Sequence, residues 1–252
     1  MIDYHIHSSF SIDGTEPPHS FACAAKRCGL EEIGFAEHVD LNPRLFGYNF
    51  LDYSHYAAVL KDLQHQNSFP IRCGIEVSYQ PHLETEIKNY ITKTHCDFVI
   101  GSVHDVNHKL MDHTFLKQCD PRDYFEAVSS LIASSTCDII GHLEYFKRWG
   151  GPYSSSDYKS EICTVLQQIV ERTLVLEVNT AGLRHPCQEL YPSLDVLRWY
   201  RKLGGTLICI GSDAHHVEDI AFHFPSVRTA LQSEGFDSVA TFSRRSLTLT
   251  EL

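Results

Sequence analysis

Residues 2–7 read IDYHIH, a short apolar strand that ends in histidine, and this arrangement recurs along the whole chain. Helix-length segments separate the recurring strands. Strands that alternate with helices are typical of a parallel sheet whose crossovers are helical. The seven predicted strands occupy residues 2–7, 31–38, 71–79, 96–104, 137–144, 173–182 and 205–215.

The segments between these strands carry apolar residues at helical spacing. In residues 17–30 proline comes early and Gly29 stands where a helix would end. The strands are almost continuously apolar, as expected when helices cover both faces of the sheet. The pattern favours either a closed barrel or a doubly wound open sheet, with residues 1–252 forming a single α/β domain. The other predicted helices cover residues 52–66, 81–94, 121–134, 156–172, 192–204 and 224–236.

Composition and charge narrow the range of possible functions, partners and compartments. The formal net charge is −11, and no run of Lys or Arg occurs, so nucleic acid is not an expected partner. The longest apolar stretches have the length of strands, and no charged segment precedes an apolar block, so we expect neither a membrane span nor a signal peptide. The nine cysteines form no C-x-x-C pair, which predicts reduced thiols in a cytoplasmic protein. The sequence makes no prediction of oligomeric state.

Six of the sixteen histidines fall at the ends of predicted strands. The carboxyl ends of parallel strands form one face, where α/β barrels have their active sites. A single histidine at a strand end is ordinarily a hydrogen-bonded structural residue, but six at equivalent positions favour a shared site. Glu37 and Glu177 are open to two interpretations, as partners that orient an imidazole or as solvated charges. The strand-end residues are His5, His7, Glu37, His38, Glu76, His104, His142, Glu177, Asn179, Asp213 and His215.

The spacing of these residues adds detail. His5 and His7 are two positions apart on a strand and so share a face, and Asp213 and His215 have the same spacing. Imidazoles and carboxylates are suitable ligands for zinc, manganese or iron. The number of candidate ligands exceeds what one tetrahedral ion accepts, so the pattern favours several ions.

Two arginines follow the fifth and sixth predicted strands. Arg148 and Arg184 offer the planar fork of donors that suits a phosphoryl group, although either could be an ordinary surface residue. The long loop after the second strand carries Phe46, Tyr48 and Phe50, which could pack on an imidazole ring or simply fold the loop onto the sheet. In the same loop region Asp40 and Asp52 could accept hydrogen bonds from an amine.

The motifs DYHIHS, FAEH, GIEV, GSVHD, GHLEYFKR, EVNTAGLR and GSDAHHVEDI, taken in order, resemble those of the PHP family, named for polymerase and histidinol phosphatase. The last three resemble its histidinol-phosphatase branch in particular. The resemblance implies a distorted (β/α)₇ TIM-like barrel. It also implies hydrolysis of L-histidinol phosphate, a small phosphate ester, to L-histidinol and phosphate in histidine biosynthesis.

The resemblance further implies three divalent metal ions, which could be zinc, manganese or iron. Asp13 stands where some relatives have histidine, and Asp213, His215 and Glu76 would take part in catalysis, with Arg148 and Arg184 binding the substrate. The implied ligand sets are His5, His7, Glu76 and Asp213 for one ion, Glu76, His104 and His142 for a second, and Asp13, His38 and His215 for a third.

Three alternatives remain open. The first is a phosphoesterase of the same family that acts on another small ester, such as a nucleotide. The second is an amidohydrolase-like barrel, which also uses strand-end histidines but needs no phosphate-binding arginine. The third is a metal-dependent interaction module without activity, which the complete ligand set and the 252-residue length disfavour.

Overall fold

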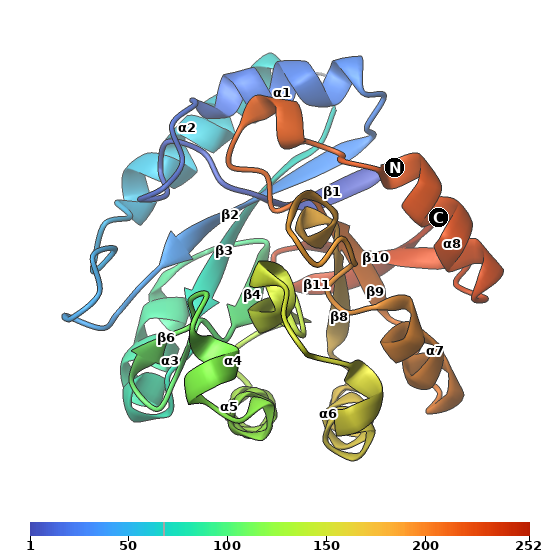
Figure 1. The fold of residues 1–252 in the computed structure, drawn as a ribbon. Helices are drawn as coiled ribbons and strands as arrows, with labels where there is room; N and C mark the ends of the chain where they lie inside the picture. Colours follow the sequence, from blue (N-terminus) through green and yellow to red (C-terminus); the bar gives the residue numbers. More distant parts are fainter. Residues whose placement is uncertain (68) are drawn as a thin grey trace.

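A computed structural model describes residues 1–67 and 69–252 and contains the predicted parallel sheet of seven strands. The strands run side by side in the order β1-β2-β3-β4-β7-β8-β9, and the helices surround them (Figure 1). Each strand pairs with its neighbour in parallel, so all carboxyl ends lie at the same side. The strands are β1 (Ile2–Ile6), β2 (Glu32–Val39), β3 (Ile71–Ser78), β4 (Phe98–Ser102), β7 (Ile139–Ile140), β8 (Val175–Asn179) and β9 (Ile208–Gly211).

The first and last strands meet, which closes the sheet almost completely. Ile6 forms a parallel bridge with Ala214. The His7 N–H donates to the Ala214 carbonyl at 2.9 Å, and the Ala214 N–H donates to the His5 carbonyl at 3.3 Å. The chain is therefore a distorted (β/α)₇ barrel, as predicted, and the open doubly wound sheet is not formed.

The helices follow the predicted segments closely, and local capping explains several boundaries. Helix α5 (Pro121–Ser134) begins after Asp120, whose carboxylate accepts the Arg122 N–H, and ends at Ser135 in the left-handed region. The remaining α-helices are α1 (Pro18–Arg27), α2 (Tyr53–Gln66), α3 (Glu84–Lys93), α4 (Phe115–Gln118), α6 (Lys159–Glu171), α7 (Leu194–Lys202) and α8 (Phe224–Ser233). The short 3₁₀ turns are η1 (Pro81–Leu83), η2 (Tyr145–Trp149), η3 (Ser155–Tyr158), η4 (Ala181–Arg184) and η5 (Val217–Asp219).

Six of the seven predicted strands end earlier than expected, and the difference is largest, four residues, for β7 and β9. Strand β7 stops at Ile140, because the His142 N–H donates to the side-chain carboxylate of Glu177 on β8 at 2.6 Å instead of to a backbone carbonyl. Strand β9 stops at Gly211, and Asp213 has a φ of 52°. The prediction that Asp213 and His215 share a strand was therefore wrong, although both residues lie at the carboxyl face.

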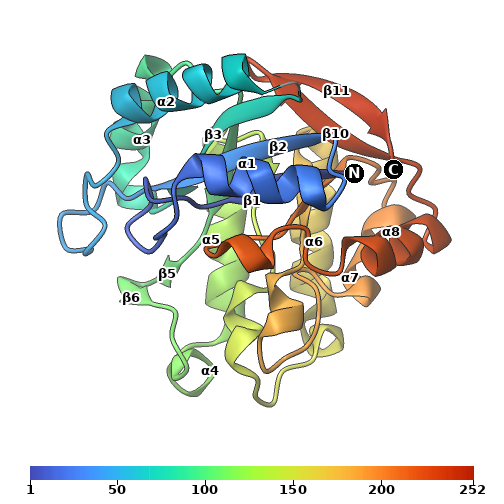
Figure 2. The same cartoon turned by 90° about the horizontal axis from the view of Figure 1, so that it is seen from above.

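A carboxy-terminal hairpin, which the sequence analysis missed, covers the amino end of the barrel. It consists of β10 (Ser238–Ser243) and β11 (Ser246–Glu251), paired antiparallel. Figure 2 shows it on the side of the molecule where both chain ends lie. Its Arg245 binds Asp138, the residue before β7, with two nitrogens at 2.9 Å, and the Phe242 N–H donates to the Tyr4 hydroxyl.

A second small hairpin follows β4. This hairpin is formed by β5 (Asp105–Val106) and β6 (Lys109–Leu110).

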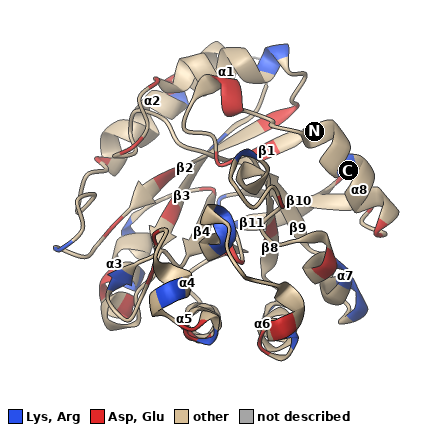
Figure 3. Ribbon diagram, in the orientation of Figure 1, with Lys and Arg blue, Asp and Glu red and all other residues tan. Residues whose placement is uncertain are grey.

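Figure 3 shows Lys, Arg, Asp and Glu on most outer helices, with further acidic residues inside strands β2 and β3. Within the described ranges, no helix has both the length and the apolar character that a membrane-spanning segment needs.

Candidate metal centre

The ends of β1, β3 and β9 bring together a buried group of imidazoles and carboxylates. The Nε2 atoms of His5 and His7 lie 3.5 and 3.6 Å from the two carboxylate oxygens of Glu76. Asp213 approaches the same nitrogens at 3.9 and 3.4 Å. His5, His7 and Glu76 are buried, so their polar atoms face one another and not water.

A second group shares Glu76. Its Oε1 lies 2.8 Å from Nε2 of His142 and 3.5 Å from Nε2 of His104. These two nitrogens are 3.3 Å apart. The Ser102 hydroxyl donates to the same Oε1 at 2.6 Å and fixes the orientation of the carboxylate.

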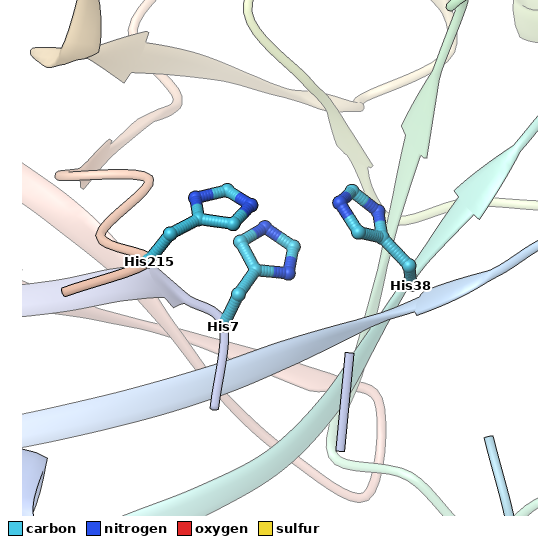
Figure 4. A group of neighbouring side chains, drawn as sticks. All are labelled: His7, His38 and His215. Carbon is cyan, nitrogen blue, oxygen red and sulfur yellow. The ribbon is translucent and has the colours of Figure 1, made fainter. Parts of the chain in front are cut away.

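A third group lies nearer the surface. Oδ2 of Asp13 is 3.5 Å from Nε2 of His38 and 3.2 Å from Nε2 of His215. The rings of His38 and His215 flank that of His7 at centroid distances of 4.2 and 4.3 Å, and Figure 4 shows the three rings close together. Asp13 is half exposed, so this group is open to solvent, unlike the other two.

Buried carboxylates behind the histidines set their orientation. Glu177 accepts from Nδ1 of His5 at 2.5 Å and from the His142 N–H at 2.6 Å. The Ser11 hydroxyl donates to Glu37 at 2.6 Å. The oxygen of that hydroxyl is therefore free to accept a hydrogen bond from Nδ1–H of His7 at 3.1 Å. Both glutamates therefore orient imidazoles, directly or through a serine, and the interpretation as solvated charges was wrong.

The unpaired atoms of the centre suit a cation. Nε2 of His5 and Nε2 of His7 are buried without a hydrogen-bond partner among the described residues. Oε2 of Glu76 has no well-aligned donor there, and Nδ1 of His38 lies 2.8 Å from it. Buried polar atoms are ordinarily paired, so lone pairs that converge without donors indicate a ligand that accepts electron pairs. Among the described residues, three groups bring their ligand atoms within 4.8 Å of one another, a spacing that fits a divalent metal ion. The groups are His7, His38 and His215, then His5, His7 and Glu76, and lastly Glu76, His104 and His142.

The ionisable groups of the site shift one another's pKa values in both directions. Burial lowers the pKa of His5 and His38, but carboxylates, chiefly Glu177 at His5 and Glu76 at His38, outweigh it and raise both pKa values, so an ion that binds there would displace a proton. Burial raises the pKa of the Glu76 carboxyl, but the neighbouring His5, His104 and His38 outweigh it and hold that pKa well below its usual range. Burial, and then the charges of His38 and His215, hold the pKa of His7 well below its usual value. Glu76 is thus ionised and His7 neutral, which are the forms that coordinate an ion.

A cavity of about 330 Å³ opens over these residues and is also lined by Arg148 and Arg184. Nη2 of Arg184 donates to the carbonyls of Ser212 and Asp213 at 3.0 and 3.1 Å. Its Nε lies 3.4 Å from the carboxylate of Asp219. Its Nη1 is buried and has no hydrogen-bond partner in residues 1–67 and 69–252. Arg184 therefore offers a fixed cationic donor to an anion that enters the cavity.

The loop after β2 does not contribute to this cavity. Phe46 is 92% exposed, and Tyr48 and Phe50 are 43% and 47% exposed. Within the described part of the chain, none of the three lines the cavity or packs fully on the barrel. Asp52 accepts the His55 N–H and caps α2 instead. The suggestion that these aromatics hold an imidazole ring finds no support in the structure.

Sequence analysis missed several residues that shape the site. Asp3 accepts the backbone N–H groups of Ser212 and Ala221 at 2.9 and 3.1 Å, which fixes the loop that carries Asp213. Ser11 and Asp219 carried no signal, because a lone serine or a loop aspartate has no recognisable spacing. His185 lines the cavity, although the sequence gives it no strand-end position.

Comparison with known proteins adds independent evidence. The PHP domain model matches residues 3–181. A histidinol-phosphatase of Lactococcus lactis is 31% identical over 96% of this chain and 94% of its own length. A histidinol-phosphatase of Bacillus subtilis is 27% identical over 88% of this chain and 96% of its own length.

A solved structure is also similar over nearly the whole chain. The crystal structure of a histidinol phosphate phosphatase from Lactococcus lactis, in complex with zinc, L-histidinol and phosphate, superposes with a TM-score of 0.88. It is 28% identical, and the alignment covers 98% of both chains. The similarity therefore includes every strand that contributes to the candidate metal centre.

Proposed function

This chain belongs to the PHP family, within its histidinol-phosphatase branch, and on that premise we propose that it hydrolyses L-histidinol phosphate to L-histidinol and phosphate. The observation that carries the proposal is the free, buried Nη1 of Arg184 beside the metal-ligand cluster. A site that only bound metal, or that hydrolysed neutral amides, would have no need of a fixed cationic donor at this place. A phosphoryl group needs it.

We further propose that three divalent ions bind at the centre. Zinc in the similar Lactococcus lactis structure supports zinc, although manganese and iron suit the same ligands. Glu76 faces imidazoles on both sides and would serve two ions. The ligand sets would be His5, His7, Glu76 and Asp213, then Glu76, His104 and His142, and finally Asp13, His38 and His215.

Different residues of the chain would have different roles in hydrolysis. Bound metal ions would supply Lewis acidity, which makes water a nucleophile at neutral pH and draws charge from phosphoryl oxygens. Arg148 and Arg184 would bind and orient the phosphoryl oxygens. Asp213 or His215, whose Oδ1 and Nδ1 atoms lie 3.6 Å apart, would hold and pass the proton that the leaving alcohol takes up.

The cavity favours a small ester. A volume of about 330 Å³ lies at the lower end of the range for ligand pockets, which suits histidinol phosphate better than a bulkier nucleotide. In the described part of the chain none of the nine thiols forms a disulfide, which supports a reducing compartment such as the cytoplasm.

The test is phosphate release from histidinol phosphate, glycerol phosphate and a nucleoside monophosphate under one metal condition. We expect kcat/KM for histidinol phosphate to exceed the other two by about a hundredfold, which corresponds to ~2.7 kcal/mol of differential binding. Metal analysis of the same sample gives the number and identity of the ions. If the nucleotide is the better substrate, the alternative phosphoesterase function replaces this proposal.

A further inference from the structure

The guanidinium of Arg148 is held in place by three neighbours. Its carbon lies over the rings of Tyr145 and Trp149, at 4.8 and 5.4 Å from their centroids. Nη1 donates to the Tyr145 hydroxyl, and Nη2 lies 2.8 Å from Nε2 of His185. An exposed arginine would sample many rotamers, whereas this one is fixed where it lines the cavity.

The chemistry of this contact determines the form of His185. A guanidinium only donates hydrogen bonds, so Nε2 of His185 must be the acceptor and the ring proton must be on Nδ1. Burial, and then the charges of Arg148 and Arg184, lower the pKa of His185 to about 4. The imidazole is therefore neutral near pH 7 and available as an acceptor.

We propose that His185 is a positioning residue, which holds Arg148 in the orientation that binds the phosphoryl group. This inference rests on the proposed function only in assigning a phosphate ester to the cavity. Arg184 is fixed in a comparable way by two backbone carbonyls and Asp219, so both arginines are pre-organised before a ligand enters. Pre-organised donors save the ordering cost that a mobile side chain would add at each binding event.

The experiment compares two substitutions in the metal-loaded enzyme. His185→Leu removes the acceptor, whereas His185→Gln places an amide oxygen near the position of Nε2. We expect the inhibition constant of inorganic phosphate, measured against p-nitrophenyl phosphate, to rise about tenfold in His185→Leu and to stay within about threefold in His185→Gln. Metal content should be unchanged in both. His19→Asn, at an exposed position of α1, is the matched control.

A double-mutant cycle isolates the role of His185. If His185 acts through Arg148, then His185→Leu should cause no further loss in an Arg148→Ala background. Additive losses, an unchanged phosphate constant in His185→Leu, or a His185→Gln enzyme as impaired as His185→Leu would each overturn the proposal. Because every phosphate monoester carries the same phosphoryl group, a preference for another ester would refute the substrate assignment and leave this test intact.

Discussion

The two ends of the barrel differ in whether their polar groups find hydrogen-bond partners within the protein. At the amino end, the Asp138 carboxylate accepts the Val99 N–H at 2.9 Å and two nitrogens of Arg245. Asp97 accepts the N–H groups of Cys73 and Arg244, each at 2.9 Å. The carboxylates of this end are thus satisfied by the protein itself, with the carboxy-terminal hairpin as the main donor.

The carboxyl end leaves its polar groups incomplete. Nine buried side-chain atoms in the described residues have no hydrogen-bond partner, and seven of them belong to this end. Unpaired buried groups cost free energy, so a fold tolerates them where a ligand completes them. The contrast separates a stabilising end from a functional end built on the same strands. The seven atoms are on His5, His7, Glu76, Ser78, His142, Thr180 and Arg184.

The largest effect should come from Glu76→Ala. Glu76 contacts imidazoles of all three ligand groups, including Nδ1 of His38 at 2.8 Å, and is placed in two proposed sets, whereas His38 is placed in one. We expect Glu76→Ala to lower kcat/KM about 10³-fold and His38→Ala about 10²-fold, since removal of one preorganised charge commonly costs this much. Metal content by elemental analysis should fall further in Glu76→Ala. Equal losses of metal and activity in the two variants would contradict a bridging role for Glu76.

The arginines of the same end should affect substrate but not metal. Arg148→Ala and Arg184→Ala each remove a charge-assisted hydrogen bond to the phosphoryl group, so kcat/KM should fall roughly ten- to a hundredfold. Metal content should equal that of the parent enzyme. Arg228→Ala, at an exposed position of α8, is the control. Full kcat/KM in both cavity variants would mean that the arginines do not bind phosphate.

A substitution at the amino end should lower the stability of the protein and leave kcat nearly unchanged. Asp138→Ala leaves the Val99 N–H and Arg245 without their partner, which should lower the free energy of unfolding by about 2 kcal/mol. The kcat of the folded fraction should stay within about twofold. Asp195→Ala removes an exposed ion pair with Arg198 and should cost less than about 1 kcal/mol. A tenfold loss of kcat in folded Asp138→Ala would show that the two ends are not independent.

The functional end could be anticipated from the sequence better than the stabilising end. Histidines at strand ends mark the carboxyl face, because the parallel arrangement places every such end on one side. Their exact supports could not be anticipated. Glu177 reaches His5 from a strand far away in sequence, and that pairing depends on barrel closure.

The carboxy-terminal hairpin was missed because its turn carries no turn signal. Arg244 and Arg245 occupy the two turn positions with φ values of 49° and 62°, where glycine or asparagine is usual. Contacts with Asp97 and Asp138 stabilise this turn, and such tertiary contacts have no local sequence pattern. The early end of β7 has the same origin, since it depends on the distant carboxylate of Glu177.

The smallest expected effect concerns a buried thiol at the amino end. Burial raises the pKa of Cys137, which lies before β7, to about 12. An unfolded chain releases the thiol proton near pH 8.5, so between this value and about pH 12 the unfolded state binds fewer protons and stability falls as pH rises. From pH 8 to about pH 9.3 this group alone should remove about 1 kcal/mol of the free energy of unfolding. Cys137→Ala should reduce the pH dependence by that amount in urea titrations, whereas Cys23→Ala, at an exposed position of α1, should leave it unchanged. An identical pH dependence in Cys137→Ala and its parent would mean that the amino end is open to water, and the contrast between the two ends would then be lost.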